Sequence, residues 1–378
     1  MKLDNPKLEK KDNQYPKLES AIIWLTESGI QTENGAFQAW YDCKKNDYSF
    51  SYPEITGYSI SLLLHIHRHM RDEMTIKKAI SAGNWLLKIQ KDNGPFYSKY
   101  FNGSCGYDYE KSLYTFDAAV CARGLLDLFK ATLDEKYLQA TTKITDWLLK
   151  QQLPNGSFPG TSHKDEIVID NHWSRMSSCH HLKIILTLLD LYKLVGSEKY
   201  LISSKKLFNW GKSLSRKNGM YALSEQCEET YTHAHNYAIE GLLKAWDFFK
   251  DATFLESAIA GAKWLAAMQN NDGSFWNFYN TKRKRIKVSD ATAQALRIWV
   301  ILERNGVRLF SENIGKSLQF LSKMQCLSPN KQSNGGIFYG QQEKNMIEHV
   351  NSWATFFTIQ ALLFRHENEK VSLASLLF

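Results

Sequence analysis

Trp264-Leu265-Ala266-Ala267-Met268-Gln269-Asn270-Asn271-Asp272-Gly273-Ser274-Phe275 is the clearest copy of a pattern that recurs along this chain. In each copy a helix that ends in an aromatic residue runs into a polar turn containing glycine, and a second aromatic residue follows. The other copies lie at 24–37, 85–96, 147–158, 210–221 and 320–338. The spacing is about 60 residues, and a fixed period of this kind is typical of repeat architectures.

Each part of the pattern has a structural reason. The aromatic and aliphatic residues anchor the helix end in the core, and Asn-Gly or Asp-Gly provides a turn with positive φ. The Gln can bond the open backbone groups of that turn. The fourth copy has lost its Gln and the sixth has a longer loop. We therefore interpret the pattern as a folding device and look for the chemistry elsewhere.

Every repeat contains an amphipathic helical stretch, such as 138–152, and a more apolar one, such as 116–129. The apolar stretches begin near Pro53, Leu113, His172, His233, Asp290 and His349. Six outer and six inner helices then alternate, which predicts an all-α (α/α)6 toroid, a six-hairpin barrel, with short β-hairpins at one rim in loops such as 96–110 and 275–289. We expect residues 1–16 to be a flexible N-terminal tail and residues 17–378 to be a single toroid domain.

Composition narrows the class of protein. The chain has 378 residues, of which 43% are hydrophobic, enough for a large core. No stretch approaches the roughly 20 apolar residues of a membrane span, and the charged start lacks an apolar signal core, so we expect a cytoplasmic protein. The net charge of +8 favours an anionic partner such as an acidic sugar, while the dispersed Lys and Arg residues argue against nucleic acid. The oligomeric state stays open.

Several chemistries lack sequence support. The six cysteines have no CxxC spacing, and the consecutive residues Cys179-His180-His181 would point in different directions on a helix. We therefore expect reduced thiols and no metal site. Nucleophile-elbow, P-loop and Rossmann motifs are missing from the sequence, so we expect no cofactor.

In such a toroid all inner helices start at the same mouth, and the polar residues that open them converge on one pocket. Taken singly these residues are ordinary helix caps or core histidines; together they have the composition of a sugar site, with aromatics to stack on rings and acids or histidines to move protons. The catalytic candidates are Glu54, Asp117, His233, His235, Tyr237 and Asp290. The substrate-binding candidates are Tyr58, Tyr107, Asp108, His172, Trp173, Arg175, Tyr231, Trp276, Gln294, His349, Asn351 and Trp353.

The pattern W-L-x3-Q-x3-G-x-F is similar to the repeat of prenyltransferase β subunits and of squalene or oxidosqualene cyclases. The acidic D-x-D-D motif of the cyclases is absent, since 107–110 reads Tyr-Asp-Tyr-Glu, and the zinc-binding Cys expected two residues after Asp290 is Thr292. The openings 52–58, 117–126, 290–299 and 351–354 resemble instead a bacterial branch of prenyltransferase/squalene-oxidase-repeat toroid proteins associated with polysaccharide biosynthesis loci. That resemblance implies saccharide substrates, and the toroid also serves uronyl hydrolases, lyases and epimerases.

The leading hypothesis is a carbohydrate-active enzyme that acts on a uronate-type saccharide at the toroid mouth. In hydrolysis, Glu54 and Asp117 would be the acid and base. In β-elimination or epimerisation, His233 or His235 with a tyrosine would abstract the proton beside a carboxylate bound by Arg175. The alternatives are a divergent isoprenoid cyclase or prenyltransferase-like enzyme and a non-catalytic glycan-binding protein.

Overall fold

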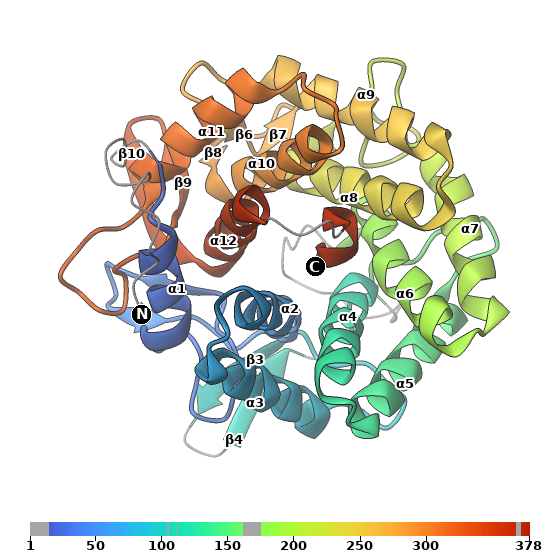
Figure 1. Cartoon of the computed structure of the whole chain (residues 1–378), viewed down its shortest axis with the longest axis horizontal. Helices are drawn as coiled ribbons and strands as arrows, with labels where there is room; N and C mark the ends of the chain where they lie inside the picture. The colour runs from blue at the N-terminus through green and yellow to red at the C-terminus, as the bar shows by residue number, and fades with distance from the viewer. Residues whose placement is uncertain (1–14, 104–105, 111, 162–174, 368–371) are drawn as a thin grey trace.

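Two concentric rings of helices form the molecule (Figure 1). The computed structural model describes residues 15–103, 106–110, 112–161, 175–367 and 372–378, without the side chains of 102–110. The outer helices are α1 (Leu18–Glu27), α3 (Glu73–Ile89), α5 (Glu135–Gln151), α7 (Glu198–Ser213), α9 (Ala252–Met268) and α11 (Ser311–Met324). The inner helices are α2 (Pro53–Met70), α4 (Thr115–Thr132), α6 (Ile185–Val195), α8 (Thr232–Phe249), α10 (Ser289–Arg304) and α12 (Ser352–His366). The predicted (α/α)6 toroid is confirmed.

Burial separates the two rings as the sequence pattern predicts. The outer helix α5 buries Tyr137, Ile144 and Leu148, which lie on one face, and exposes the opposite face. The inner helix α4 is buried on nearly every side, because it contacts neighbours in both rings. A one-sided apolar stripe suits a surface helix, whereas all-round burial suits a core helix.

The repeated turn joins each repeat to the next. In five copies the Gln side chain donates to the carbonyl of its own turn Gly and to a carbonyl of the following outer segment; Gln269 bonds Gly273 and Asn313, each at 3.1 Å. The corresponding residues are Gln31, Gln90, Gln152 and Gln325. A Cβ on Gly273 would lie 2.0 Å from the Lys316 carbonyl oxygen, so the close approach requires glycine as well as its φ of +91°. The turns are therefore the interfaces between repeats.

The last turn closes the ring onto the first helix. Gln325 donates to the Lys17 carbonyl at 3.0 Å and accepts from the Lys17 amide at 2.7 Å. Gly335 of the same turn packs on the Ser20 carbonyl at the start of α1. The sixth repeat thus uses the same contact as the others, across a gap of more than 300 residues in sequence.

Short strands cover the rim at which the inner helices start. One sheet has the order β2-β1-β10-β9-β8-β6, with neighbouring strands antiparallel. Its strands are β1 (Trp40–Asp42), β2 (Asp47–Tyr48), β6 (Phe275–Trp276), β8 (Lys287–Val288), β9 (Phe338–Gln342) and β10 (Asn345–Asn351). Two further sheets have two strands each. One is a hairpin of β3 (Lys99–Gly103) and β4 (Gly106–Glu110), and the other pairs β5 (Thr230–Tyr231) with β7 (Phe278–Tyr279). The expected rim strands are thus present, and β5, β8 and β10 each lead directly into an inner helix.

One of the expected helix starts needs correction, and another lies outside the described residues. The third inner helix was placed near His172, which lies outside the described residues; its described part begins with the 3-10 turn η3 (Cys179–Ile184) and continues as α6. His349 belongs to strand β10, and α12 begins at Ser352.

Side chains and the last residues of the chain fill the axis of the ring. Residues 372–378, including the 3-10 turn η4 (Leu373–Leu376), lie in the centre (Figure 1). The Ser375 carbonyl accepts from Arg123 at 3.0 Å, and the Phe378 ring packs 5.8 Å from that of Tyr58. We call the rim at the N-termini of the inner helices the helix-start mouth and the opposite one the helix-end mouth. No helix in the described ranges is long and apolar enough to cross a membrane.

Candidate functional site

Two buried carboxyl groups meet at the helix-start mouth. Glu54 stands in the first turn of α2, and Asp117 stands in the first turn of the neighbouring α4. The hydroxyl of Tyr52 donates to Asp117 Oδ2 at 2.7 Å and also hydrogen-bonds with Glu54. The Trp353 indole of α12 donates to Glu54 Oε1 at 3.4 Å. Three inner helices therefore hold one acidic pair.

The environment favours the protonated form of Glu54. Burial raises the pKa of the Glu54 carboxyl well above 4.5, and the nearby Asp117 raises it further. Two carboxylates in one buried site do not both ionise at low cost, since each like charge opposes the other. The pair thus offers a proton donor beside a second carboxyl group, the arrangement that general acid–base chemistry needs.

A second acid–base pair lies on α8 and α10. Nδ1 of His233 is 3.1 Å from Oδ2 of Asp290, and both side chains are buried. The His233 ring packs 4.5 Å from the Tyr237 ring, edge to face. Tyr231 lies at the end of β5, and its ring centre is 5.8 Å from that of His233. A carboxylate that orients an imidazole in this way can prepare it to accept a proton.

A buried cation, which the sequence reasoning missed, lies below these groups. Lys183 of η3 is only 4% exposed, and its Nζ is 2.7 Å from Glu240 Oε2 of α8. The ammonium also lies 4.2 Å from the Tyr237 ring centre and 4.8 Å from that of Tyr58. Burial lowers the pKa of Lys183 to about 7, although Glu240 and Glu54 oppose the change. Lys183 therefore titrates near neutral pH, directly beneath Glu54.

Arg297 of α10 completes the deeper layer. It forms an ion pair with Glu240 and donates to Gln360 of α12 at 2.6 Å, and all three side chains are buried. Glu240 thus faces two cations, Lys183 and Arg297. Above them, the hydroxyl of Tyr58 donates to that of Tyr237 at 2.8 Å. The floor of the mouth is therefore polar and charged.

The structure corrects the role expected for His235. Its Nδ1 accepts from the Tyr221 amide at 3.1 Å, and its Nε2 lies 3.3 Å from the Gly261 carbonyl oxygen. Burial lowers the pKa of the imidazole to about 3. Both ring nitrogens serve the backbone of the turn and of α9, so His235 is a packing residue and not a proton-transfer group.

The rim candidates are spread over several elements. Asn351 caps α12 by accepting from the Ala354 amide at 2.9 Å. The ring of His349 stacks on Trp40 at 5.4 Å, and its Nε2 lies 3.4 Å from Asp42, so it is part of the rim sheet. Trp276 lies in β6 and carries the Arg285 guanidinium 5.2 Å above its ring. These residues border the mouth without joining the carboxyl pair.

The remaining candidates divide into two groups. Gln294 of α10 is fully buried, and neither of its amide atoms has a hydrogen-bond partner in the described part of the chain. His172 and Trp173 lie outside the described residues, as do the side chains of Tyr107 and Asp108; Arg175 borders that segment, with its backbone against Gly160. Within the described ranges, no group of three or more His, Cys, Asp or Glu side chains could hold a metal ion.

Comparison with known families supports two descriptions of the chain. Residues 89–235 match the sequence model of Glycosyl Hydrolase Family 88. Residues 168–327 match that of the prenyltransferase alpha-alpha toroid domain. No curated protein matches the chain in sequence. The second match agrees with the repeat seen in the sequence, and the first contains Asp117 and His233.

Solved structures share the fold across almost the whole chain. A sugar epimerase from a ruminal bacterium has a TM-score of 0.75 at 13% identity, covering 93% of this chain and 100% of its own. An unsaturated glucuronyl hydrolase specific for heparin has a TM-score of 0.70 at 14% identity, covering 94% and 97%. The cellobiose 2-epimerase of Bacillus thermoamylovorans has a TM-score of 0.73 at 12% identity, covering 90% and 95%. At these identities the likeness establishes the toroid fold.

Proposed function

We propose that this protein is a carbohydrate-active enzyme that hydrolyses a uronate-type glycoside at the helix-start mouth. The observation that carries the proposal is the buried pair of Glu54 and Asp117 bridged by Tyr52. Most glycoside hydrolases use two carboxyl groups, one protonated and one ionised. The match to Glycosyl Hydrolase Family 88 agrees with the predicted class.

In this proposal Glu54 is the general acid. It gives its proton to the glycosidic oxygen as the bond to the anomeric carbon breaks, and the leaving sugar departs as an alcohol. Asp117 faces the anomeric carbon as base or nucleophile, and water supplies the hydroxyl group of the product.

The surroundings support an acidic sugar. The loop between β7 and β8 at this mouth carries Arg283 and Arg285 on the aromatic rings of Phe278 and Trp276. Guanidinium groups on aromatic faces suit a ligand that combines a sugar ring with a carboxylate. The solved neighbours include unsaturated glucuronyl hydrolases. Together these favour a uronate over a neutral sugar.

Epimerisation is the second candidate, because the His233–Asp290 pair is a ready proton acceptor and two neighbours are sugar epimerases. The isoprenoid alternative fits less well, since the axis below the mouth carries Lys183, Glu240 and Arg297 rather than an apolar lining. A hydrocarbon chain would have to displace these paired charges at high cost.

Single substitutions separate these candidates. Glu54→Gln and Asp117→Asn would be assayed on unsaturated glucuronyl disaccharides for new reducing ends, and His233→Gln by NMR for an epimerised sugar. Glu256→Gln, on the exposed face of α9, is the matched carboxylate control. Hydrolysis predicts that the first two variants lose at least about 100-fold in kcat while the control is unchanged. Full turnover in both carboxyl variants would refute the hydrolytic proposal. If the wild type shows no turnover and the variants lose only saccharide binding, the protein is a glycan-binding protein.

A further inference from the structure

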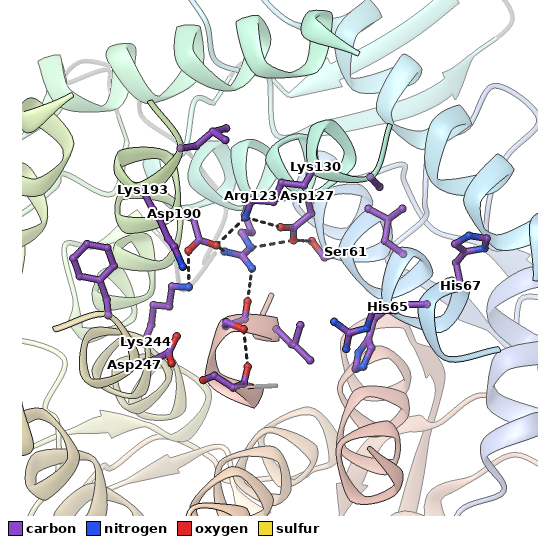
Figure 2. A pocket seen from close by; sticks show the side chains of 18 of the residues that line it. Ser61, His65, His67, Arg123, Asp127, Lys130, Asp190, Lys193, Lys244 and Asp247 are labelled. Carbon is purple, nitrogen blue, oxygen red and sulfur yellow. Dashed lines mark hydrogen bonds and ion pairs between the residues drawn. The ribbon is translucent and has the colours of Figure 1, made fainter. Parts of the chain in front are cut away.

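A large cavity opens at the helix-end mouth, on the far side of the ring from the proposed catalytic pair. Its volume is about 1080 Å³, enough for a ligand of several sugar rings or a nucleotide. The C-terminal halves of α2, α4, α6 and α8 line it, together with residues of η4 such as Ser375 and Leu376 (Figure 2). The proposed reaction does not use this cavity.

The lining is strongly cationic. Seven Arg and Lys side chains face only three Asp side chains, and two His residues lie among them. The basic residues are Arg68, Arg71, Arg123, Lys130, Lys193, Lys244 and Lys250. The acidic ones are Asp127, Asp190 and Asp247. A cavity lined mainly by one sign of charge concentrates ligands of the opposite sign, so the excess favours an anionic ligand.

Asp190 shows how the excess arises. Its carboxylate receives the ammonium of Lys244 at 2.5 Å, that of Lys130 at 3.2 Å and the guanidinium of Arg123. These cations hold the pKa of Asp190 far below its usual range. Lys193 stands one turn further along α6, and no ion pair of its side chain is found in the described ranges (Figure 2). Asp127 also pairs with Arg123 at 3.0 Å and with Lys130 at 3.6 Å, so two carboxylates lie among four cations.

The remaining charges at this mouth are partly balanced. Lys250 pairs with Asp247 at 3.1 Å, and Arg68 pairs with the nearby Glu367 at 3.3 Å. Glu367 also lies 3.3 Å from the imidazole of His65. The four helix ends contribute roughly half a negative charge each, which explains part of the basic lining. Glu367 and the helix ends together account for about three of the four surplus positive charges. Lys193 and Arg71 line the cavity, and neither forms an ion pair within the described part of the chain.

We propose that the helix-end mouth is a second ligand site, which binds a small polyanion bearing phosphate, sulfate or carboxylate groups. Lys130, Lys193 and Lys244 would hold the anionic oxygens above Asp190, and the Phe248 ring supplies an apolar wall on which a sugar ring can stack. The proposal does not depend on the reaction at the opposite mouth.

Isothermal titration of the full chain with three probes tests the proposal: inorganic pyrophosphate, a glucuronate tetrasaccharide and neutral maltotetraose. The test variant is the double substitution Lys130→Gln/Lys193→Gln, and the control is Lys205→Gln on the exposed face of α7. The double variant leaves Asp190 paired with Arg123 and Lys244, so it should fold, and its thermal melting curve would show this.

We expect at least one anionic probe to bind with an affinity that falls about tenfold in the double variant and with added salt, while the control binds as the wild type. Binding of pyrophosphate alone would identify a phosphate-type ligand, and binding of the tetrasaccharide as well would identify an acidic saccharide. Binding that the double variant leaves unchanged, or binding of maltotetraose alone, would overturn the proposal.

Discussion

Replacement of Lys183 by Met should stabilise the protein at pH 6. The side chain is buried between Tyr58, Tyr237 and Glu240, and Met has nearly its shape without the charge. Glu240 keeps its pairing with Arg297, so the substitution leaves no orphaned charge in the axis. The change in the free energy of unfolding therefore measures how much the burial of this cation destabilises the fold.

The magnitude follows from proton linkage. Burial lowers the pKa of Lys183 from 10.5 to about 7, and a difference of about 3.5 in pKa corresponds to about 5 kcal/mol. This is an upper value, since replacing buried ion pairs by apolar side chains typically gains about 1–4 kcal/mol. Between pH 7 and pH 10.5 the unfolded chain binds more protons at this lysine than the folded one, so wild-type stability from this group rises with pH. The cost is full below pH 7.

Urea denaturation at pH 6 and pH 9 would check the reasoning. We expect Lys183→Met to raise the free energy of unfolding by about 1–4 kcal/mol at pH 6 and by less at pH 9. Lys205→Met, at an exposed position, should change stability by no more than about 0.5 kcal/mol at either pH. A Lys183→Met protein that is less stable than the wild type at pH 6, with the same difference at pH 9, would refute the account.

Three further outcomes are expected. Glu54→Gln should lose activity, and its stability relative to the wild type should increase as pH rises above 4.5. The raised pKa of Glu54 means that the wild type loses stability over this range, and urea curves of both proteins at pH 5 and pH 8 measure the difference. Gly124→Ala should lower the free energy of unfolding by about 1–3 kcal/mol in thermal melts, since its Cβ would lie 2.5 Å from the Gly57 carbonyl oxygen. Gly315→Ala, with nothing within 4 Å of its Cβ, should raise it by about 0.5–1 kcal/mol, and equal effects of the two substitutions would contradict the close packing of α2 on α4. Gln269→Ala should lower the free energy of unfolding, measured by denaturant titration, by about 1–3 kcal/mol, because two carbonyl groups lose their hydrogen-bond donor. An unchanged stability would show that this turn does not stabilise the contact between repeats.

The fold was predictable because its main signal is periodic. Six copies of one turn imply six equivalent hairpins, and each hairpin must bury its apolar face on its neighbours. The meeting of the two carboxyl groups was predictable for a related reason, since Glu54 and Asp117 each lie in the first turn of an inner helix and these first turns meet at one mouth. Geometry that depends on equivalence between repeats can be inferred from sequence.

The errors arose where one repeat departs from the others. Lys183 lies in the 3-10 turn η3, in a stretch that the sequence pattern had assigned to an α-helix. Its signal was a single charge in the apolar run 182–186, and Glu240 and Arg297 are similar isolated charges in apolar helices. His233 and His235 are two residues apart, so a helical rotation of about 200° places their side chains on nearly opposite sides of α8 and only one can face the axis. The partners of each charge lie on other helices, so they could not be deduced from the sequence without the fold.

The contact between Gln325 and Lys17 has a consequence for how the chain can be cut. Every repeat has two neighbours, so no position in the ring is structurally terminal, and loss of one interface does not leave a frayed end as it would in an open solenoid. A circular permutant that begins at the exposed Asn305-Gly306 turn, with the old ends joined by a linker long enough to reach from the axis to α1, would retain all six interfaces. We expect such a protein to unfold in one cooperative step, because every repeat keeps both of its neighbours.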